Sequence, residues 1–375
     1  MIDRQLHHRL AKKCFQGKAI LLIGSRQVGK TTLVKEVVKQ LDTSVLFLDG
    51  DDPAVRSLLK SPSTEEIRQI IGQYKVVFID EAQRIASIGL TDKIITDQFK
   101  KTQLILSGSS SFDLGQEVQE PLTGRKWTYE LFPISWQEWQ DHIGYVKSEQ
   151  DLLNRLVLGL YPDVLNHQED ATEVLKELTE SYLYKDVLQL AGLRKPQLLQ
   201  KLLQALAYQV GSEVVYKEIA DLLRVDPKTI AHYIEIMEKA FIIFRLPSFS
   251  RNLRNEIKSN QKIYFYDNGI RNAAINRLTI SSEREDIGIL WENFLVSERI
   301  KQLRYNKKTN GSFFWRTKQQ QEIDYVEESE DCLLAVEFKW NTKRNAKIPK
   351  TFTNTYTADS AVITRANFRE FVLMK

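Results

Sequence analysis

The sequence has only two cysteines, no long apolar run and no N-terminal segment that resembles a secretory signal. Its two cysteines, Cys14 and Cys332, lie far apart with no CxxC spacing, which argues against a disulfide framework and against a zinc site. No apolar run approaches the roughly 18 residues that a membrane-spanning helix needs. Residues 1–15 carry many basic side chains and no apolar core, unlike a secretory signal. We therefore expect a cytoplasmic protein with no membrane partner.

Internal repeats and low-complexity linkers are also missing, so domains show only as changes of pattern along the 375 residues. A content of 42% hydrophobic residues is enough for two or three domains of about 150 residues, each with its own core. The net charge of +4 is too small to identify a polyanionic partner. Positive charge is concentrated between residues 191 and 262, where a nucleic-acid contact and an ordinary solvated face are the alternatives.

Four regions differ in pattern. Residues 1–135 alternate short β-rich runs with helical stretches, which is typical of an α/β fold with a parallel sheet. Residues 136–206 have helical periodicity and are expected to form a helical lid. Residues 207–262 have the pattern of a winged-helix module, and residues 263–375 that of a second α/β domain. The strands expected in the first region are residues 19–23, 45–48, 76–79, 103–106 and 127–131.

A phosphate-binding loop follows the first expected strand. Residues 24–31 read Gly-Ser-Arg-Gln-Val-Gly-Lys-Thr, a full match to GxxxxGK[ST], and a helical run begins directly after them. In such a loop Lys30 reaches the β- and γ-phosphates and the Thr31 hydroxyl binds Mg²⁺, so the sequence predicts ATP and Mg²⁺ as cofactors. The predicted nucleotide contacts are Gly24, Ser25, Arg26, Gln27, Val28, Gly29, Lys30, Thr31 and Thr32.

Later segments supply catalytic candidates for ATP hydrolysis. The apolar residues 76–79 end in Asp80 and Glu81, where Asp80 would hold Mg²⁺ through water and Glu81 would polarise the attacking water. The strand expected at 103–106 runs into small hydroxyl residues, among which Ser109 is the candidate for orienting that water. Arg125 is placed where it would reach the γ-phosphate of a neighbouring subunit, and the alternative is an ordinary surface arginine.

Together these motifs resemble those of the prokaryotic AAA+ superfamily ATPases that carry a C-terminal domain of unknown function. The resemblance covers nearly the whole chain and implies an α/β AAA+ fold. It also implies a homo-oligomer, in the form of a ring, with the ATP site between subunits and Arg125 acting as an arginine finger in trans. The motifs are Gly-Ser-Arg-Gln-Val-Gly-Lys-Thr-Thr-Leu, Phe-Ile-Asp-Glu-Ala-Gln, Ser-Gly-Ser-Ser-Ser, Leu-Thr-Gly-Arg, Leu-Phe-Pro-Ile-Ser-Trp, Tyr-Pro-Asp at 161–163, Tyr-Phe-Tyr-Asp-Asn-Gly-Ile-Arg-Asn at 264–272 and Leu-Trp-Glu-Asn-Phe at 290–294.

A helix–turn–helix is predicted between residues 216 and 241. Residues 216–223 form a short amphipathic helix, and Asp226 with Pro227 begins a second helix. The outward face of that second helix carries only two fixed positive charges, so a structural or protein-contact role remains an alternative to reading DNA. Phosphate contacts are predicted instead for the basic residues beyond it, with DNA favoured over RNA as the nucleic-acid partner. These are Arg245, Arg251, Arg254, Lys258 and Lys262.

Two carboxylates and a lysine near the C-terminus form a third candidate site. Asp324 and Glu337 are predicted on adjacent strands, and Lys339 shares a face with Glu337 because residues two apart on a strand point the same way. Two carboxylates in this arrangement hold a divalent metal, Mg²⁺ or Mn²⁺, while the lysine orients or activates water. The alternative is a surface ladder of ion pairs.

This pattern resembles the D…ExK site of the PD-(D/E)XK nuclease superfamily. The resemblance extends to a preceding helix with Glu292 and Glu298, since the leading helix of that superfamily often donates an acidic residue. It implies that residues 263–375 form a nuclease-like domain with Asp324, Glu337 and Lys339 as catalytic residues.

Two interpretations of the whole chain remain. In the first, an AAA+ ATPase is coupled to a nuclease-like domain that binds or cleaves nucleic acid. In the second, the ATPase switches a C-terminal interaction module that cuts nothing. A scaffold with an inactive phosphate loop is disfavoured, because Lys30, Thr31, Asp80 and Glu81 are all present.

Overall fold

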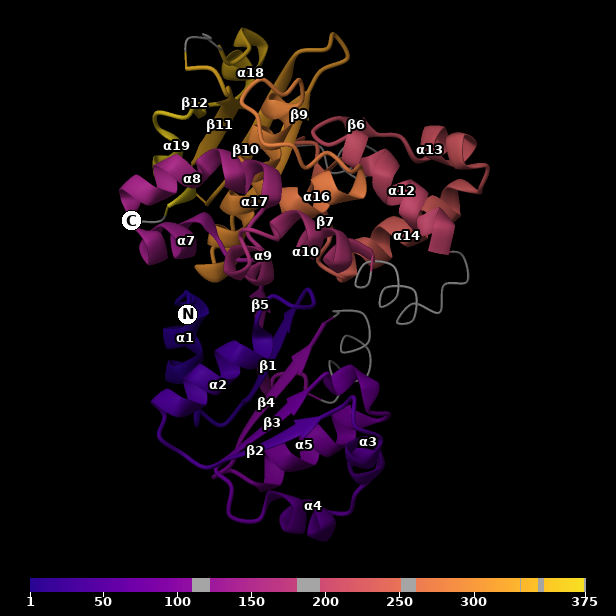
Figure 1. Ribbon diagram of the computed structural model, residues 1–375, viewed down its shortest axis with the longest axis vertical. Helices are drawn as coiled ribbons and strands as arrows, with labels where there is room; N and C mark the ends of the chain where they lie inside the picture. The colour runs from indigo at the N-terminus through magenta and orange to yellow at the C-terminus, as the bar shows by residue number, and fades with distance from the viewer. Residues whose placement is uncertain (110–121, 181–195, 251–260, 331, 343–346, 374–375) are drawn as a thin grey trace. The chain divides into compact units, whose positions relative to one another are not determined.

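The computed structural model describes residues 1–109, 122–180, 196–250, 261–330, 332–342 and 347–373. The chain divides into two compact units (Figure 1). The first unit is Met1–Phe132 with Lys239–Phe241, and the second is Pro133–Glu238 with Ile242–Lys375. Among the described helices, none combines the length and the apolar character that crossing a bilayer requires.

The first unit contains a five-stranded parallel sheet with the order β2-β3-β4-β1-β5. A strand lies at each of the five places where the sequence predicts one. Strands β1 and β4 are buried along their whole length, as expected for central parallel strands, and helices cover both faces of the sheet (Figure 1). The strands are β1 (Ala19–Gly24), β2 (Val45–Asp49), β3 (Val76–Asp80), β4 (Gln103–Gly108) and β5 (Lys126–Leu131). The helices are α1 (Leu6–Lys13), α2 (Lys30–Gln40), α3 (Pro53–Leu59), α4 (Thr64–Ile71), η1 (Ala82–Arg84) and α5 (Ile88–Gln98).

The position of β4 between β1 and β3 determines where the candidate residues meet. Because all these strands are parallel, their carboxyl ends lie at one edge of the sheet, which is where α/β proteins bind ligands. The phosphate loop leaves β1, Asp80 ends β3, and Ser107 lies on β4 between them.

The second unit begins with helices, as the periodicity of residues 136–206 predicts. Helix α7 starts at a capping box in which Ser135 and Glu138 satisfy each other's backbone N–H groups. Helix α8 follows directly, and Gly159 caps its C-terminal end. The helices of this region are α7 (Trp136–Ile143), α8 (Tyr145–Leu158), α9 (Pro162–Asn166), α10 (Ala171–Glu177) and α12 (Pro196–Tyr208).

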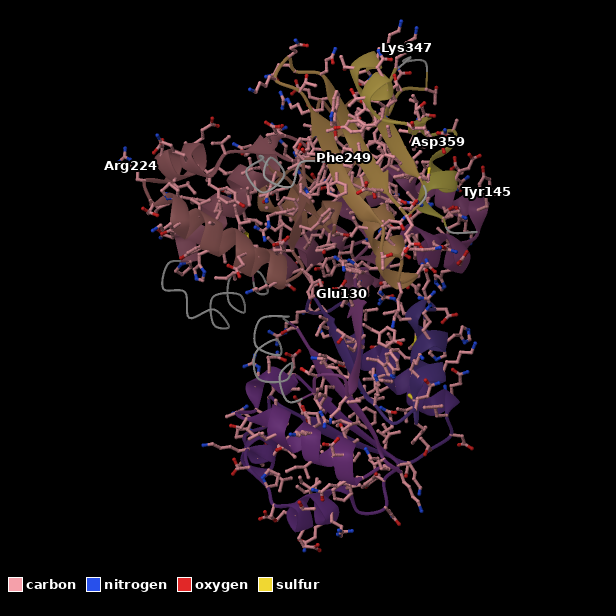
Figure 2. The ribbon with its side chains drawn as sticks, turned by 180° about the vertical axis from the view of Figure 1, so that it is seen from behind. Glu130, Tyr145, Arg224, Phe249, Lys347 and Asp359 are labelled. Carbon is pink, nitrogen blue, oxygen red and sulfur yellow. The ribbon has the colours of Figure 1, made fainter. Side chains whose placement is uncertain are left out.

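Two helices and three short strands follow. Arg224 lies in the left-handed conformation at the tip between α13 and α14 (Figure 2), and the Asp226 carboxylate accepts from the Lys228 N–H at the start of α14. The strands form an antiparallel sheet in the order β6-β8-β7. The elements are β6 (Glu213–Val214), α13 (Tyr216–Leu223), α14 (Pro227–Lys239), β7 (Ile243–Pro247) and β8 (Gln261–Phe265).

The structure does not leave Arg245 and Lys262 free for phosphate contacts, so this expectation is wrong for both. Arg245 forms an ion pair with Glu238, its Nε lying 2.8 Å from a carboxylate oxygen. Lys262 is only 1% exposed and pairs with Glu292 and Glu322. Nothing in the local sequence marks either residue as paired, because the partners are set by tertiary packing. Arg251, Arg254 and Lys258 lie outside the described residues.

The C-terminal part of the second unit is a four-stranded sheet with the order β12-β11-β10-β9. Strand β10 pairs antiparallel with both β9 and β11, whereas β11 and β12 pair in parallel. Phe249 (Figure 2) packs into the core of this sheet against the rings of Phe313 and Tyr356. The elements are α16 (Asn268–Ala274), α17 (Ile287–Tyr305), β9 (Gly311–Arg316), β10 (Glu322–Glu328), β11 (Leu333–Phe338), α18 (Lys350–Thr355), β12 (Asp359–Ile363) and α19 (Phe368–Val372).

Buried side chains from residues 264–272 donate hydrogen bonds to carbonyls at the C-terminal end of α8. The last carbonyls of a helix have no partner within the helix, and a buried carbonyl without a partner is unfavourable. Asn268 donates to the Leu156 carbonyl at 2.9 Å and Asn272 donates to the Val157 carbonyl at 2.8 Å. The Asp-Asn-Gly-Ile-Arg-Asn motif therefore has a structural role in the second unit.

Gly159, directly after α8, lies against the same segment of residues 264–272. It has a φ of +73°, and a Cβ atom at this position would lie 2.0 Å from Oδ1 of Asp267. The same Asp267 carboxylate accepts from the Leu160 N–H at 2.7 Å. Only glycine combines this backbone conformation with this close approach.

Candidate functional site

The phosphate loop joins β1 to α2 with two residues at positive φ. Gly29, at φ 91°, directly precedes α2, and Gln27 has a φ of 59°. Gly24 opens the loop where a Cβ atom would lie 2.1 Å from the Leu131 carbonyl oxygen. The glycines of the motif are thus required by the backbone path as well as by the approach of a phosphate.

Lys30 is held inside this loop by the loop itself. Its Nζ donates to the carbonyl oxygens of Gly24 at 3.0 Å and Ser25 at 2.8 Å, and the residue is 6% exposed. Burial lowers the pKa of Lys30 to about 8, although the carboxylates of Glu81 and Asp80 act in the opposite direction. A phosphate oxygen beside Nζ would favour the charged ammonium.

This lowered pKa predicts proton uptake on nucleotide binding. Phosphate oxygens favour the charged ammonium of Lys30 and so raise its pKa. Above pH 8 part of the protein carries a neutral Lys30, and these molecules must take up a proton when ATP binds. We expect ATP affinity to fall as the pH rises above 8. Calorimetry in buffers of different ionisation enthalpy measures the uptake, and an affinity independent of pH with no uptake would contradict the prediction.

Asp80 connects the loop to the next strands. The Thr31 hydroxyl donates to Oδ2 of Asp80 at 2.5 Å, and the Ser107 hydroxyl donates to the other carboxylate oxygen, Oδ1. Hydroxyl and carboxylate oxygens are the ligands that Mg²⁺ prefers, so Thr31 and Asp80 together fit this ion. Ser107 was not among the predicted residues, since its relation to Asp80 depends on the order of the strands.

Glu81 follows Asp80 in a strained backbone conformation. Its φ is 45° and its ψ 44°, a left-handed conformation that non-glycine residues adopt mainly where the surroundings enforce it. The Gly50 N–H donates to the Asp80 carbonyl at 2.9 Å, and a Cβ atom on Gly50 would lie 2.4 Å from the Glu81 carbonyl oxygen. Like Ser107, Gly50 has no mark in the sequence that connects it with Asp80 and Glu81.

Two side chains bind the same oxygen of the Glu81 carboxylate. Gln83 Nε2 donates to Oε2 of Glu81 at 2.5 Å, and the Ser109 hydroxyl donates to it at 3.2 Å. Gln83 also donates to Ser109 Oγ at 3.0 Å. Ser109, predicted to orient water directly, thus lies against the predicted base. Gln83 belongs to the Phe-Ile-Asp-Glu-Ala-Gln motif, but the motif alone gives it no role.

Arg4 contacts the phosphate loop from the N-terminal segment. Its guanidinium donates to the Val28 carbonyl at 2.8 Å and to the Phe132 carbonyl at 2.6 Å. It is buried, and it fixes the backbone of the loop one residue before Gly29. No spacing rule connects residue 4 with a loop at 24–31, so this contact could not be predicted.

Arg125 lies far from the phosphate loop of its own chain. It precedes β5, whose first residue pairs with Ala19 at the start of β1, whereas the loop leaves the other end of β1. Its Nε forms an ion pair with Asp97 at 2.8 Å, and the side chain is 43% exposed. This position is incompatible with action on a nucleotide in the same chain.

The structure brings Asp324, Glu337 and Lys339 together in the second unit. Asp324 on β10 and Glu337 on β11 lie on paired strands, and the backbone N–H of Phe338 donates to Oδ2 of Asp324 at 2.8 Å. Lys339 Nζ lies 2.7 Å from Oε2 of Glu337 and 3.7 Å from Oδ2 of Asp324. Burial and the nearby Asp324 charge raise the pKa of Glu337.

Glu292 of α17 adds a third carboxylate near this cluster. Its Oε1 accepts from the Tyr264 hydroxyl at 2.7 Å and lies 3.5 Å from Lys262 Nζ. Burial raises the pKa of Glu292 to about 7 against the opposing effect of Lys262. Among the described residues, however, no group of three or more His, Cys, Asp or Glu side chains is arranged to hold a metal ion.

Glu298, the other acidic residue expected on the leading helix, points elsewhere. It accepts from the Trp136 N–H at 2.6 Å and pairs with Lys301 at 2.7 Å, and both charged side chains are buried. Glu298 therefore accepts a hydrogen bond from the first turn of α7 and does not belong to the Asp324 cluster.

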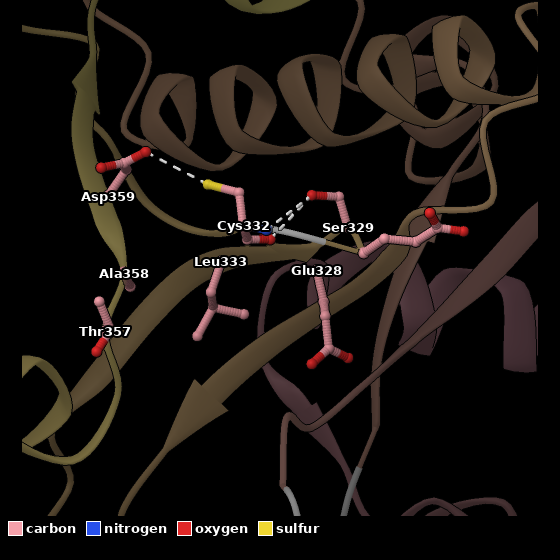
Figure 3. A pocket seen from close by; sticks show the side chains of 8 residues that line it. Glu328, Ser329, Cys332, Leu333, Thr357, Ala358 and Asp359 are labelled. Carbon is pink, nitrogen blue, oxygen red and sulfur yellow. Dashed lines mark hydrogen bonds between the residues drawn. The ribbon is translucent and has the colours of Figure 1, made fainter.

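A pocket of about 450 Å³ lies at the other end of the same sheet (Figure 3). It is lined by residues of the β10–β11 connection and by residues around the start of β12, among them Glu328, Cys332 and Asp359. The Cys332 thiol donates to Asp359 at 3.3 Å. Because Glu328 ends β10 and Leu333 begins β11, this pocket is separate from the Asp324 cluster at the opposite ends of both strands.

Comparison with protein families divides the chain into three matching segments. Residues 16–140 match an AAA domain. Residues 149–281 and 287–372 match two domains of unknown function, DUF8612 and DUF4143.

The chain is also similar to several proteins over most of its length. An uncharacterized protein of Mycobacterium tuberculosis is 27% identical over 326 residues, covering 85% of this chain and 70% of that protein. One of Methanocaldococcus jannaschii is 23% identical over 335 residues, covering 84% and 73%.

Among solved structures, the Walker-type ATPase PABY2304 of Pyrococcus abyssi has a TM-score of 0.48 at 16% identity and covers 73% of this chain and 96% of that chain. The Thermotoga maritima RuvB Holliday junction branch migration motor has a TM-score of 0.34 at 18% identity and covers 66% and 90%. Neither score is high enough to establish a common fold. The AAA-domain match and the structure agree in this region, since the matched residues contain β1, a phosphate-loop sequence and α2 in that order.

Proposed function

We propose that the first unit hydrolyses ATP with Mg²⁺. The observation that carries this proposal is the convergence of Thr31 and Asp80, whose oxygens lie 2.5 Å apart between the phosphate loop and β3. The buried Lys30, which donates to two loop carbonyls, lies within reach of the charge of Asp80, and Glu81 follows Asp80 directly.

Each residue then has a defined task. Lys30 exchanges its bonds to the loop carbonyls for bonds to the β- and γ-phosphate oxygens. Thr31 and Asp80 hold Mg²⁺, which neutralises phosphate charge when bound. Glu81 accepts a proton from water as the water oxygen bonds to the γ-phosphorus, and ADP leaves with the electron pair of the broken P–O bond.

The test is phosphate release by the full chain with ATP, measured with Mg²⁺ and with excess EDTA. Hydrolysis that requires Mg²⁺ and is lost on Asp80→Asn is expected. A full chain that binds ATP but releases no phosphate under any metal condition would refute the proposal.

We further propose a homo-oligomeric ring in which Arg125 acts on the ATP of a neighbouring subunit. Support comes from its position at the opposite end of β1 from the loop of its own chain. Arg125→Ala is expected to lower kcat by roughly 10³-fold with ATP affinity nearly unchanged, because the guanidinium acts on charge in the transition state.

Mixing subunits tests the action in trans. Arg125→Ala subunits combined with Glu81→Gln subunits are expected to regain partial activity at shared interfaces. Arg68→Ala is the control, since Arg68 also forms an exposed ion pair in this unit, with Glu65. A monomer with full turnover at high protein concentration would contradict both the ring and the role of Arg125.

For the second unit we propose a helical lid at 136–206, a winged-helix module at 207–262 and a nuclease-like domain at 263–375 that binds or cleaves nucleic acid. The order helix, strand, two helices and two strands supports the winged helix. The approach of Lys339 to both Asp324 and Glu337 supports the nuclease-like site. DNA is the favoured substrate, and Mg²⁺ or Mn²⁺ the favoured metal.

The nuclease assignment predicts that Asp324→Ala, Glu337→Ala and Lys339→Ala abolish metal-dependent cleavage while ATP hydrolysis continues. The two carboxylates would lose the metal, and the lysine would no longer position water. Cleavage is measured on several DNA and RNA substrates with Mg²⁺, Mn²⁺ or Ca²⁺. Glu328→Ala is the control, because Glu328 is an exposed carboxylate on the same strand as Asp324.

The alternative function is an ATP-switched assembly protein whose second unit is an interaction module. In that case Asp324, Glu337 and Lys339 form a structural ion-pair network. Their substitution then lowers the melting temperature, and the parent protein shows no metal-dependent cleavage. That pair of results would exclude the nuclease.

A further inference from the structure

The geometry points to Gln83 as a positioning residue for ATP hydrolysis, one that anchors a single oxygen of Glu81 so that the other faces the attacking water. This inference rests on the proposed ATPase function. It assigns a role that neither the loop motif nor the Asp80–Glu81 pair contains.

The hydrogen bonds to Glu81 are strongly one-sided. Oε2 accepts from both Gln83 Nε2, at 2.5 Å, and Ser109 Oγ, at 3.2 Å. Within the described part of the chain, no hydrogen bond reaches Oε1 of Glu81. A carboxylate held at one oxygen keeps its plane and direction, and it leaves the second oxygen available to accept a proton.

Chemistry assigns the orientation of the Gln83 amide. A carboxylate oxygen only accepts, so the amide atom 2.5 Å away must be the NH₂ group, because a carbonyl oxygen there would be repelled. The same NH₂ group donates to Ser109 Oγ at 3.0 Å. Both its protons are thereby used, and the amide is locked between β4 and the turn after β3.

The backbone supports the same arrangement. Glu81 and Gln83 are two residues apart across a left-handed turn, with Glu81 at φ 45° directly before η1. If β3 continued through Glu81 and Gln83, their side chains would lie on one face of the strand but would extend side by side. Their terminal groups would then not meet. The strained turn is what brings the amide of Gln83 onto the carboxylate of Glu81.

In the reaction, Oε1 of Glu81 takes the water proton while the water oxygen bonds to the γ-phosphorus, and the bond to the bridging oxygen breaks with its electrons leaving on ADP. Gln83 is unchanged and touches neither water nor nucleotide. Its contribution is to orientation, so its loss is expected to reduce kcat and to leave nucleotide binding intact.

The experiment compares the parent with Gln83→Met, Gln83→Glu and Ser109→Ala in the full chain. Gln83→Met keeps the length and removes both donors, and Gln83→Glu keeps the shape but places a like charge against Glu81. We expect both to lower kcat roughly ten- to a hundredfold with KM for ATP, ADP affinity and melting temperature within error of the parent. Ser109→Ala should lower kcat less, because it removes only the longer of the two bonds to Oε2 of Glu81. Gln73→Met, an exposed glutamine of the same unit, is the control.

Parent kcat in Gln83→Met would overturn the inference while leaving the ATPase proposal intact. So would a loss accompanied by lower nucleotide affinity and melting temperature, since that pattern marks a purely structural role. A parent protein without Mg²⁺-dependent hydrolysis would overturn both proposals.

Discussion

Lys30→Ala is expected to abolish tight ATP binding, whereas Glu81→Gln is expected to preserve binding and stop turnover. Lys30 is the buried ammonium of the loop, and its charge-assisted bonds to phosphate are worth about 1.5–3 kcal/mol each. Losing two of them weakens binding by roughly 10²–10⁴-fold. Glutamine in place of Glu81 keeps the shape but cannot accept a proton, which lowers kcat by roughly 10²–10⁴-fold.

Equilibrium binding of a fluorescent ATP analogue and phosphate release measure the two effects separately. Lys39→Ala is the matched control for charge, because Lys39 is an exposed lysine near the other end of α2. If the Glu81→Gln protein hydrolysed ATP like the parent, another residue would be the base. If Lys30→Ala bound ATP normally, the loop would not be the phosphate site.

Gly159→Ala is expected to be among the most destabilising single substitutions in the second unit. A Cβ atom would lie 2.0 Å from the Asp267 carboxylate, so Asp267 must move and give up its bond to the Leu160 N–H. Asp267 is buried, and an unsatisfied buried group adds to the strain of alanine at φ +73°. Together these effects amount to a loss of roughly 3–5 kcal/mol in the free energy of unfolding.

Gly144→Ala separates steric clash from backbone strain. Gly144 also has a positive φ, 85°, but nothing lies within 4 Å of its Cβ position. It should therefore lose only the strain contribution of about 1–3 kcal/mol. Urea unfolding of the two variants and the parent measures the difference, and equal losses would show that the contact with Asp267 is unimportant.

In the phosphate site, the residues that the sequence predicts are contiguous. Lys30 and Thr31 are marked by a motif whose spacing reflects one strand, one loop and one helix. The pairing of Gln83 with Ser109 was not predictable, because it requires β4 to lie next to β3 and Glu81 to adopt a left-handed turn. Periodicity reports on burial within an element but carries no information about strand order.

Because the sequence does not show tertiary packing, the predictions for two charged residues are wrong. The basic stretch predicts a phosphate contact for Lys262, yet Lys262 is buried against Glu292 and Glu322 from α17 and β10. Arg245 was expected to contact phosphate and instead pairs with Glu238. For Asp324, Glu337 and Lys339 the alternation of strand residues was sufficient, since two of them share one strand face and the third lies on a hairpin partner.

The closure of α8 by Asn268 and Asn272 has a consequence for the order of events during synthesis. The donors to the carbonyls of Leu156 and Val157 lie 112 and 115 residues later in the chain. The acceptor of the Trp136 N–H, Glu298, lies 162 residues later. A unit whose contacts span such separations cannot complete its folding while the ribosome is still making its first half, because loop closure must precede the contacts that stabilise it. The P-loop sheet, by contrast, is complete once residue 131 has emerged. A nascent chain can therefore complete the sheet that carries the phosphate loop while the helices of its second unit still lack the contacts that bury them.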